Sequence, residues 1–94
     1  MKNLPLQLPT FDPGTVWLAG AGPGDPGLIT ILAWHGLCNA DIIVYDALVS
    51  ELILEGASSN AELIYAGKRG GKPSQRQEDI SRKLVELALE GKRV

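Results

Sequence analysis

Residues 16 to 27 read VWLAGAGPGDPG, and this stretch decides the fold. A short apolar run, Val16 to Gly20, leads directly into a loop rich in glycine and proline. A continuous apolar run of this kind is typical of a strand buried on both faces of a parallel sheet. Glycine lets the backbone approach a ligand, and a helix that follows such a loop presents its N-terminus to it. We therefore expect a small molecule to bind at this loop.

Further strands and helices alternate along the rest of the chain. Residues rich in β-branched and aromatic side chains predict strands at 41–46 and 62–66, and residues 92–94 would begin a fourth strand. Capping residues and apolar periodicity predict three helices. They begin at Asp25–Pro26, Ser50 and Ser74 and end near Asn39, Ile53 and Gly91, respectively.

This alternation predicts an α/β fold with an open, mainly parallel sheet and flanking helices. Binding sites in such sheets lie at the carboxyl ends of the strands, where three loops of this chain would meet. The 94 residues suffice for one small domain. We expect an irregular leader over residues 1–14 and, because a core strand would only begin at the end of the sequence, a truncated N-terminal α/β domain over residues 15–94.

Composition limits the cellular compartment and the kinds of partner that we expect for the protein. The net charge of −2 neither demands nor excludes a charged partner, and the single Cys38 cannot form an internal disulfide. Prolines interrupt the N-terminal residues, which argues against a secretory signal. No stretch approaches the roughly 20 apolar residues of a membrane span. We expect a cytoplasmic protein without a membrane partner.

The first loop departs from two common phosphate-binding motifs. In a dinucleotide fingerprint Gly20 and Gly22 would fit, but the third glycine position holds Asp25, and Pro23 removes a backbone N–H. The Gly-Lys-Ser/Thr run of an ATP-binding phosphate loop does not follow here either. A ligand without phosphate suits the loop better. A non-catalytic nucleotide-binding or regulatory module on a Rossmann-like sheet remains the alternative.

Three motifs together resemble the tetrapyrrole methylase family: GAGPGDPGLIT, VYDALVS and YAGKRGGKPS. The resemblance covers about residues 16–94, and it is strongest to members that methylate uroporphyrinogen III. It implies transfer of methyl groups from S-adenosylmethionine to carbons 2 and 7 of that substrate, with precorrin-2 and S-adenosylhomocysteine as products. This reaction leads to siroheme and cobalamin.

The resemblance also implies roles for particular residues. Asp46 matches the proton acceptor of the family and Lys68 its proton donor, whereas a capping aspartate and a solvated lysine are the simpler interpretations. Pro23, between Gly22 and Gly24, matches a contact with S-adenosylmethionine. Such a reaction needs the two reactants held together and protons managed on the macrocycle.

A basic cluster follows the third predicted strand, with no acid between Glu62 and Glu78. Besides Lys68 it contains Arg69, Lys72 and Arg76, which we expect to bind the carboxylates of the substrate. A merely solvated face is the simpler interpretation. No aromatic residue is interleaved for base stacking, so nucleic acid is not expected as a partner.

Other residues suggest no cofactor role. His35, beside Trp34, has no second ligand at metal spacing, so we expect no metal. An unpaired strand edge would favour self-association, which predicts a homodimer. The resemblance implies that most of the S-adenosylmethionine site and a second domain belong to later sequence, so we expect the 94 residues alone to be inactive.

Overall fold

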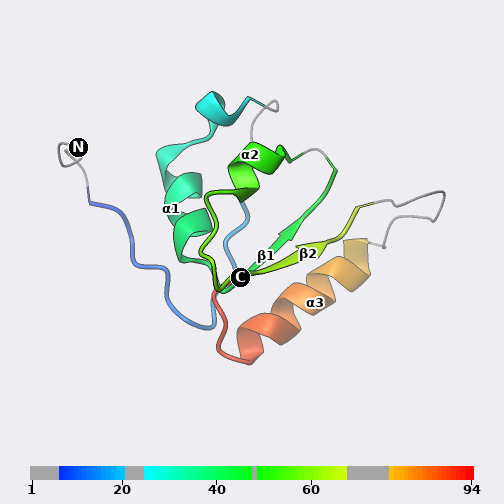
Figure 1. Cartoon of the computed structure of the whole chain (residues 1–94). Coiled ribbons are helices and arrows are strands. Elements are labelled where there is room, and N and C mark those ends of the chain that lie inside the picture. Colours follow the sequence, from blue (N-terminus) through cyan, green and yellow to red (C-terminus); the bar gives the residue numbers. More distant parts are fainter. Residues whose placement is uncertain (1–6, 21–24, 48, 68–76) are drawn as a thin grey trace.

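The computed structural model describes residues 7–20, 25–47, 49–67 and 77–94. Figure 1 shows a small sheet with helices around it. The elements, in chain order, are a 3-10 helix η1 (Pro26–Leu28), α1 (Ile31–Asn39), β1 (Ile42–Tyr45), α2 (Glu51–Leu54), β2 (Glu62–Tyr65) and α3 (Gln77–Leu89).

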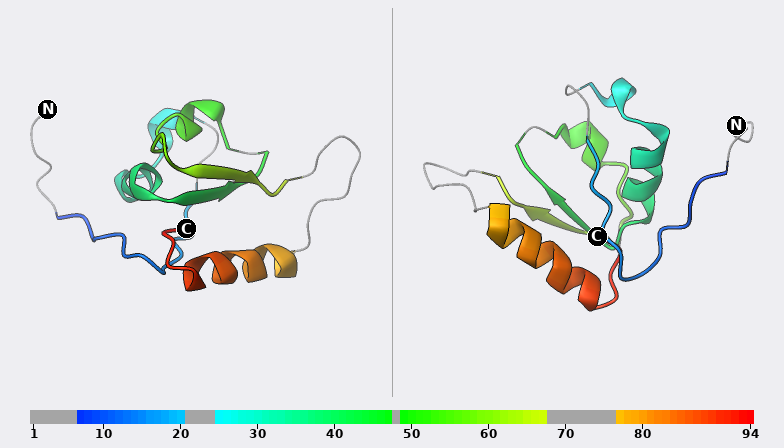
Figure 2. Two further views of the ribbon diagram at one scale, coloured as in Figure 1. Left: turned by 60° about the horizontal axis from the view of Figure 1, so that its bottom comes forward. Right: turned by 180° about the vertical axis from the view of Figure 1, so that it is seen from behind.

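The sheet is parallel and has helices on both faces. Strands β1 and β2 pair in register from Ile42 opposite Glu62 to Tyr45 opposite Tyr65. Figure 2 shows α1 and α2 on one side of the sheet and α3 on the other. The predicted α/β class, with a parallel sheet and flanking helices, is therefore confirmed.

Two further segments extend the backbone pairing beside β1. Val94 donates to the Thr15 carbonyl at 3.1 Å and accepts from the Trp17 N–H at 2.8 Å, which is the pattern of parallel strands. On its other side, the Arg93 carbonyl accepts from the Ile42 N–H at 3.1 Å. Residues 92–94 therefore lie between residues 14–17 and β1, as the start of a fourth strand would.

The predicted strand at 16–20 is wrong as a regular element. Between described residues its backbone pairing ends at Trp17, and Leu18 is 85% exposed. A strand needs partners along its length, and residues 92–94 reach only its first part.

The helix expected from Asp25–Pro26 begins later than predicted. Asp25 instead closes the short turn η1, where its Oδ1 accepts from the Gly27 N–H at 2.8 Å. The chain then straightens at Thr30, whose hydroxyl accepts from the Ala33 N–H at 3.0 Å and caps α1. Threonine is a good N-cap in its own right, so the start of the helix is displaced to Ile31. Its end at Asn39 is confirmed.

The caps of the other two helices agree with the sequence where the structure describes them. The Ser50 hydroxyl accepts from the Leu52 N–H at 3.2 Å, which confirms the predicted start of α2. Gly91 has a positive φ of 87° just after α3, as expected of a glycine that ends a helix. Ser74, the predicted cap of α3, lies outside the described residues.

The best-buried apolar cluster lies between the sheet and α3. It contains Ile42, Leu87 and Val94, against which Val16, Val44, Ile64 and Leu84 pack. By contrast, several large apolar side chains of η1 and α1 are about half exposed: Leu28, Ile31, Leu32 and Trp34. The α3 face therefore supplies the more complete core of this chain.

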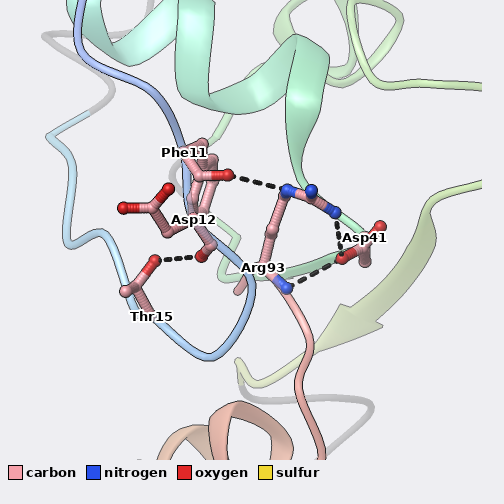
Figure 3. Close-up of polar contacts among 5 residues, drawn as sticks. All are labelled: Phe11, Asp12, Thr15, Asp41 and Arg93. Carbon is pink, nitrogen blue, oxygen red and sulfur yellow. Dashed lines mark hydrogen bonds and ion pairs between the residues drawn. The ribbon is translucent and has the colours of Figure 1, made fainter.

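Asp41 and Arg93 connect three distant parts of the chain (Figure 3). The Arg93 N–H donates to Asp41 Oδ2 at 2.8 Å, and its guanidinium lies 3.3 Å from the same oxygen. The guanidinium also donates to the Phe11 carbonyl at 2.7 Å. The Arg93 backbone N–H, with help from its guanidinium charge, holds the pKa of Asp41 below the ordinary value.

This lowered pKa predicts a stability that depends on pH. Since the folded state favours the carboxylate, the contribution of Asp41 is present above its unfolded pKa, about 3.9, and is lost as pH falls through the lower folded pKa. Thermal unfolding between pH 6 and pH 2.5 should show the melting-temperature difference between the native chain and Asp41→Asn narrowing below about pH 4. An equal difference at every pH would contradict this assignment, and exposed Asp12→Asn serves as the control.

Candidate functional site

The carboxyl ends of β1 and β2 lie side by side at one edge of the sheet. Tyr45 and Tyr65 are the paired last residues of the two strands. The Ala66 N–H then donates to the Tyr45 carbonyl at 2.8 Å, which continues the pairing one residue further. The two following loops therefore start from the same place, as a binding site in this fold requires.

Asp46 is the first residue beyond β1 and is exposed. Its carbonyl accepts from the Val49 N–H at 3.3 Å, so the chain turns here before Ser50 caps α2. The capping role weighed for this aspartate belongs to Ser50 instead. Asp46 is thus placed at the strand-end edge, where an acidic group can reach a bound molecule.

The loop after β2 comes into contact with the loop that carries Asp46. A Cβ added at Gly67 would lie 3.1 Å from the Ala47 nitrogen and 2.6 Å from the Tyr65 hydroxyl. Any side chain at this position would therefore require the Tyr65 ring or the Ala47 backbone to shift. Gly67 immediately precedes Lys68, and Ala47 immediately follows Asp46. The sequence neighbours of the two predicted catalytic residues are therefore brought together.

The remaining predicted site residues lie outside the described residues. They are Gly22, Pro23 and Gly24 of the first loop and Lys68, Arg69, Lys72 and Arg76 after β2. The residues that flank the first loop are described. Gly20 is exposed, and a Cβ there would meet nothing within 4 Å. The backbone at Gly20 is thus open on the side where a Cβ would lie.

A pair of tyrosines at this edge was not singled out from the sequence. The rings of Tyr45 and Tyr65 meet edge to face, with centroids 5.4 Å apart. The sequence contains a signal for this pair, because the two strands read IIVY and ELIY and both end on tyrosine. In a parallel register equivalent ends meet, which accounts for the contact between the two rings at this edge.

The histidine and the tryptophans of the chain have structural contacts. His35 Nε2 lies 2.8 Å from the Pro9 carbonyl oxygen, and Trp17 stacks on Phe11 with ring centroids 4.4 Å apart. Within the described ranges, no three side chains of the metal-binding types gather into a cluster. The described helices also include none that is long and apolar enough to cross a membrane.

The sequence matches one family model over residues 15–94, that of the Tetrapyrrole (Corrin/Porphyrin) Methylases. The chain belongs to the tetrapyrrole methylase family. This confirms the resemblance carried by the three loop motifs, which the match includes in full.

Curated proteins of known name are also similar to the chain. The chain is 60% identical, over all of its 94 residues, to a uroporphyrinogen-III C-methyltransferase of a Sinorhizobium species, of which it covers 34%. It is 48% identical over 92% of its length to a siroheme synthase of Pseudomonas fluorescens, of which it covers 18%. The chain therefore spans about a third or less of the length of these relatives.

Solved structures of family members have the same fold. The cobalt precorrin-4 methyltransferase matches 86% of this chain at 30% identity, with a TM-score of 0.70, and 32% of that structure is covered. The uroporphyrin-III C-methyl transferase of Thermus thermophilus in complex with S-adenosyl homocysteine matches 80% of the chain at 37% identity. Its TM-score is 0.61, and the match covers 28% of that structure.

Proposed function

We propose that the protein carrying this chain transfers methyl groups from S-adenosylmethionine to uroporphyrinogen III. Two observations support the proposal: the chain is 60% identical to a uroporphyrinogen-III C-methyltransferase, and the loops after β1 and β2 start from the same edge of a parallel sheet. The finer proposal is methylation at carbons 2 and 7 to give precorrin-2. The resulting product would feed siroheme and cobalamin synthesis.

The residues at the described edge suit this cofactor. The methyl-bearing sulfur of S-adenosylmethionine is cationic, and an exposed carboxylate together with two tyrosine rings provides favourable surroundings for a cation. In the proposal, Gly22, Pro23 and Gly24 hold the cofactor from the first loop. Bound there, the cofactor supplies an electrophilic methyl group.

Asp46 and Lys68 have complementary proton-transfer roles in the proposal. As the pyrrole carbon bonds to the methyl group, the sulfur–methyl bond breaks and the thioether leaves with that electron pair. For each methyl group that the macrocycle gains it loses one proton, which Asp46 accepts; Lys68 donates a proton only where the macrocycle gives up a second one, so that the charge balances. The close approach of Gly67 to Ala47 supports this pairing, because it brings the two loops to the same edge.

Substrate binding is assigned to the basic loop after β2. Arg69, Lys72 and Arg76 would bind the peripheral carboxylates of uroporphyrinogen III. A homodimer is part of the same proposal, with support from the half-exposed apolar side chains of η1 and α1.

Product analysis tests the function directly. The full-length protein, given S-adenosylmethionine and uroporphyrinogen III under reducing conditions, should release S-adenosylhomocysteine and form a product that carries two added methyl groups. Absence of both would overturn the proposal. The rival regulatory module predicts ligand binding that survives Asp46→Ala and no turnover by any variant.

A further inference from the structure

The ring of Tyr65 lies against Gly67, close to where the loops after β1 and β2 approach each other. A Cβ built on Gly67 would lie 2.6 Å from the Tyr65 hydroxyl oxygen and 2.7 Å from its Cζ. The backbone nitrogen of Ala47, on the loop after β1, lies 3.1 Å from the same point. The ring of a β2 residue therefore reaches the loop that follows β1, and the glycine leaves room for it.

The pleat of the sheet explains why this ring meets that loop. Val44 and Ile64 pack against the apolar cluster on the α3 side of the sheet. Neighbouring residues of a strand point to opposite faces, so Tyr45 and Tyr65 lie on the face that α1 and α2 cover. The turn that carries Asp46 leads from β1 to α2 on this same face (Figure 2).

The Tyr65 ring is held more firmly than the turn beside it. Its edge-to-face contact with the Tyr45 ring has a centroid distance of 5.4 Å, and its backbone lies in a strand whose pairing continues through buried Ala66. By contrast, the Val49 N–H reaches the Asp46 carbonyl at 3.3 Å, which is beyond the usual range for an N–H to oxygen hydrogen bond. The ring is therefore a rigid support beside a weakly bonded turn.

We infer that Tyr65 is a positioning residue, whose ring holds the turn after β1 so that the Asp46 carboxylate stays in place at the strand-end edge. The inference rests on the proposed function, in which Asp46 accepts a proton from the substrate. A proton acceptor must lie within hydrogen-bond reach of its proton, and a displacement of about 1 Å can cost about 10²-fold in rate. The ring carries this role, because Cζ approaches Gly67 nearly as closely as the hydroxyl oxygen does.

Three single variants of the full-length protein separate this role from a structural one. Tyr65→Leu removes the ring and should lower the single-turnover rate of methyl transfer by about tenfold or more, with little change in S-adenosylhomocysteine affinity. Tyr65→Phe keeps the ring and should stay within about threefold of the native rate. Trp17→Leu is the matched control: it removes a ring that lies against Gly36 and stacks on Phe11, so it should lower the melting temperature without lowering the rate.

A double variant tests whether Tyr65 acts through Asp46. In the Asp46→Asn protein the proton acceptor is already absent, so the addition of Tyr65→Leu should change the rate by less than about threefold. A further loss of about tenfold in the double variant would overturn the inference, because Tyr65 would then act independently of Asp46. A native rate in Tyr65→Leu, or an equal loss in Tyr65→Phe and Tyr65→Leu, would overturn it as well.

Amide hydrogen exchange at Val49, measured by NMR, tests the inference without turnover. Exchange at this N–H reports how often its hydrogen bond to the Asp46 carbonyl opens. It should be about tenfold faster in Tyr65→Leu and unaltered in Tyr65→Phe and Trp17→Leu. Equal exchange in all variants would overturn the positioning role even if the native protein transfers methyl groups. Absence of methyl transfer by the native protein would instead overturn the proposed function, and faster exchange in Tyr65→Leu would still show that the ring holds the turn.

Discussion

Asp46→Asn should lower the rate of methyl transfer by about 10²- to 10⁴-fold in the full-length enzyme, the usual contribution of a general base. Asparagine keeps the size of the side chain but cannot accept the proton that the macrocycle loses. Asp46 is exposed, and Ser50 rather than Asp46 caps α2, so the fold should survive. Single-turnover rates and S-adenosylhomocysteine affinity are the measurements, and the affinity should change little.

Two further variants separate a proton-transfer role from a structural one. Asp12→Asn makes the same chemical change at an exposed position in the N-terminal segment and should leave the rate unaltered. Lys68→Met should resemble Asp46→Asn. A loss below about threefold for Asp46→Asn would reduce the aspartate to a structural residue of its turn.

Gly36→Ala should destabilise the fold, although alanine is the better helix former. In mid-helix the exchange alone would add about 1 kcal/mol of stability. Here the new Cβ would lie 2.7 Å from Cε3 of Trp17, whose ring is stacked on Phe11. Overpacking of this kind costs roughly 1–3 kcal/mol. We expect a net loss of about 1 kcal/mol, measured as a melting temperature about 4–8 °C lower.

A double-mutant cycle tests whether the Trp17 ring causes the loss of stability in Gly36→Ala. In a Trp17→Leu background the ring is gone, so Gly36→Ala should become neutral or stabilising. Gly20→Ala is the matched control, because nothing lies within 4 Å of its added Cβ, and its effect should stay within about 0.5 kcal/mol. If Gly36→Ala stabilises the chain that retains Trp17, the prediction is wrong and the Trp17 ring moves aside freely.

The sequence predicted those elements whose signals are local. The runs IIVY and ELIY form strands, Ser50 caps α2, and Gly91 ends α3 with a positive φ. The two helix ends depend on residues a few positions away, and the two strand runs are rich in β-branched and aromatic residues, so both signals can be read along the chain. The three loop motifs likewise identified the family.

Tertiary structure decided the features that depend on distant partners. Residues 16–20 have strand composition, but pairing with residues 92–94 reaches only their first part. The approach of Gly67 to Ala47 also arises from how the chain folds back. Propensity is a property of neighbouring residues, whereas a hydrogen-bonded ladder and a close backbone approach require segments far apart in sequence. Residue types and their order therefore determined the family and the class of fold, while the edge at which the loop that carries Asp46 approaches Gly67 exists only once the strands have paired.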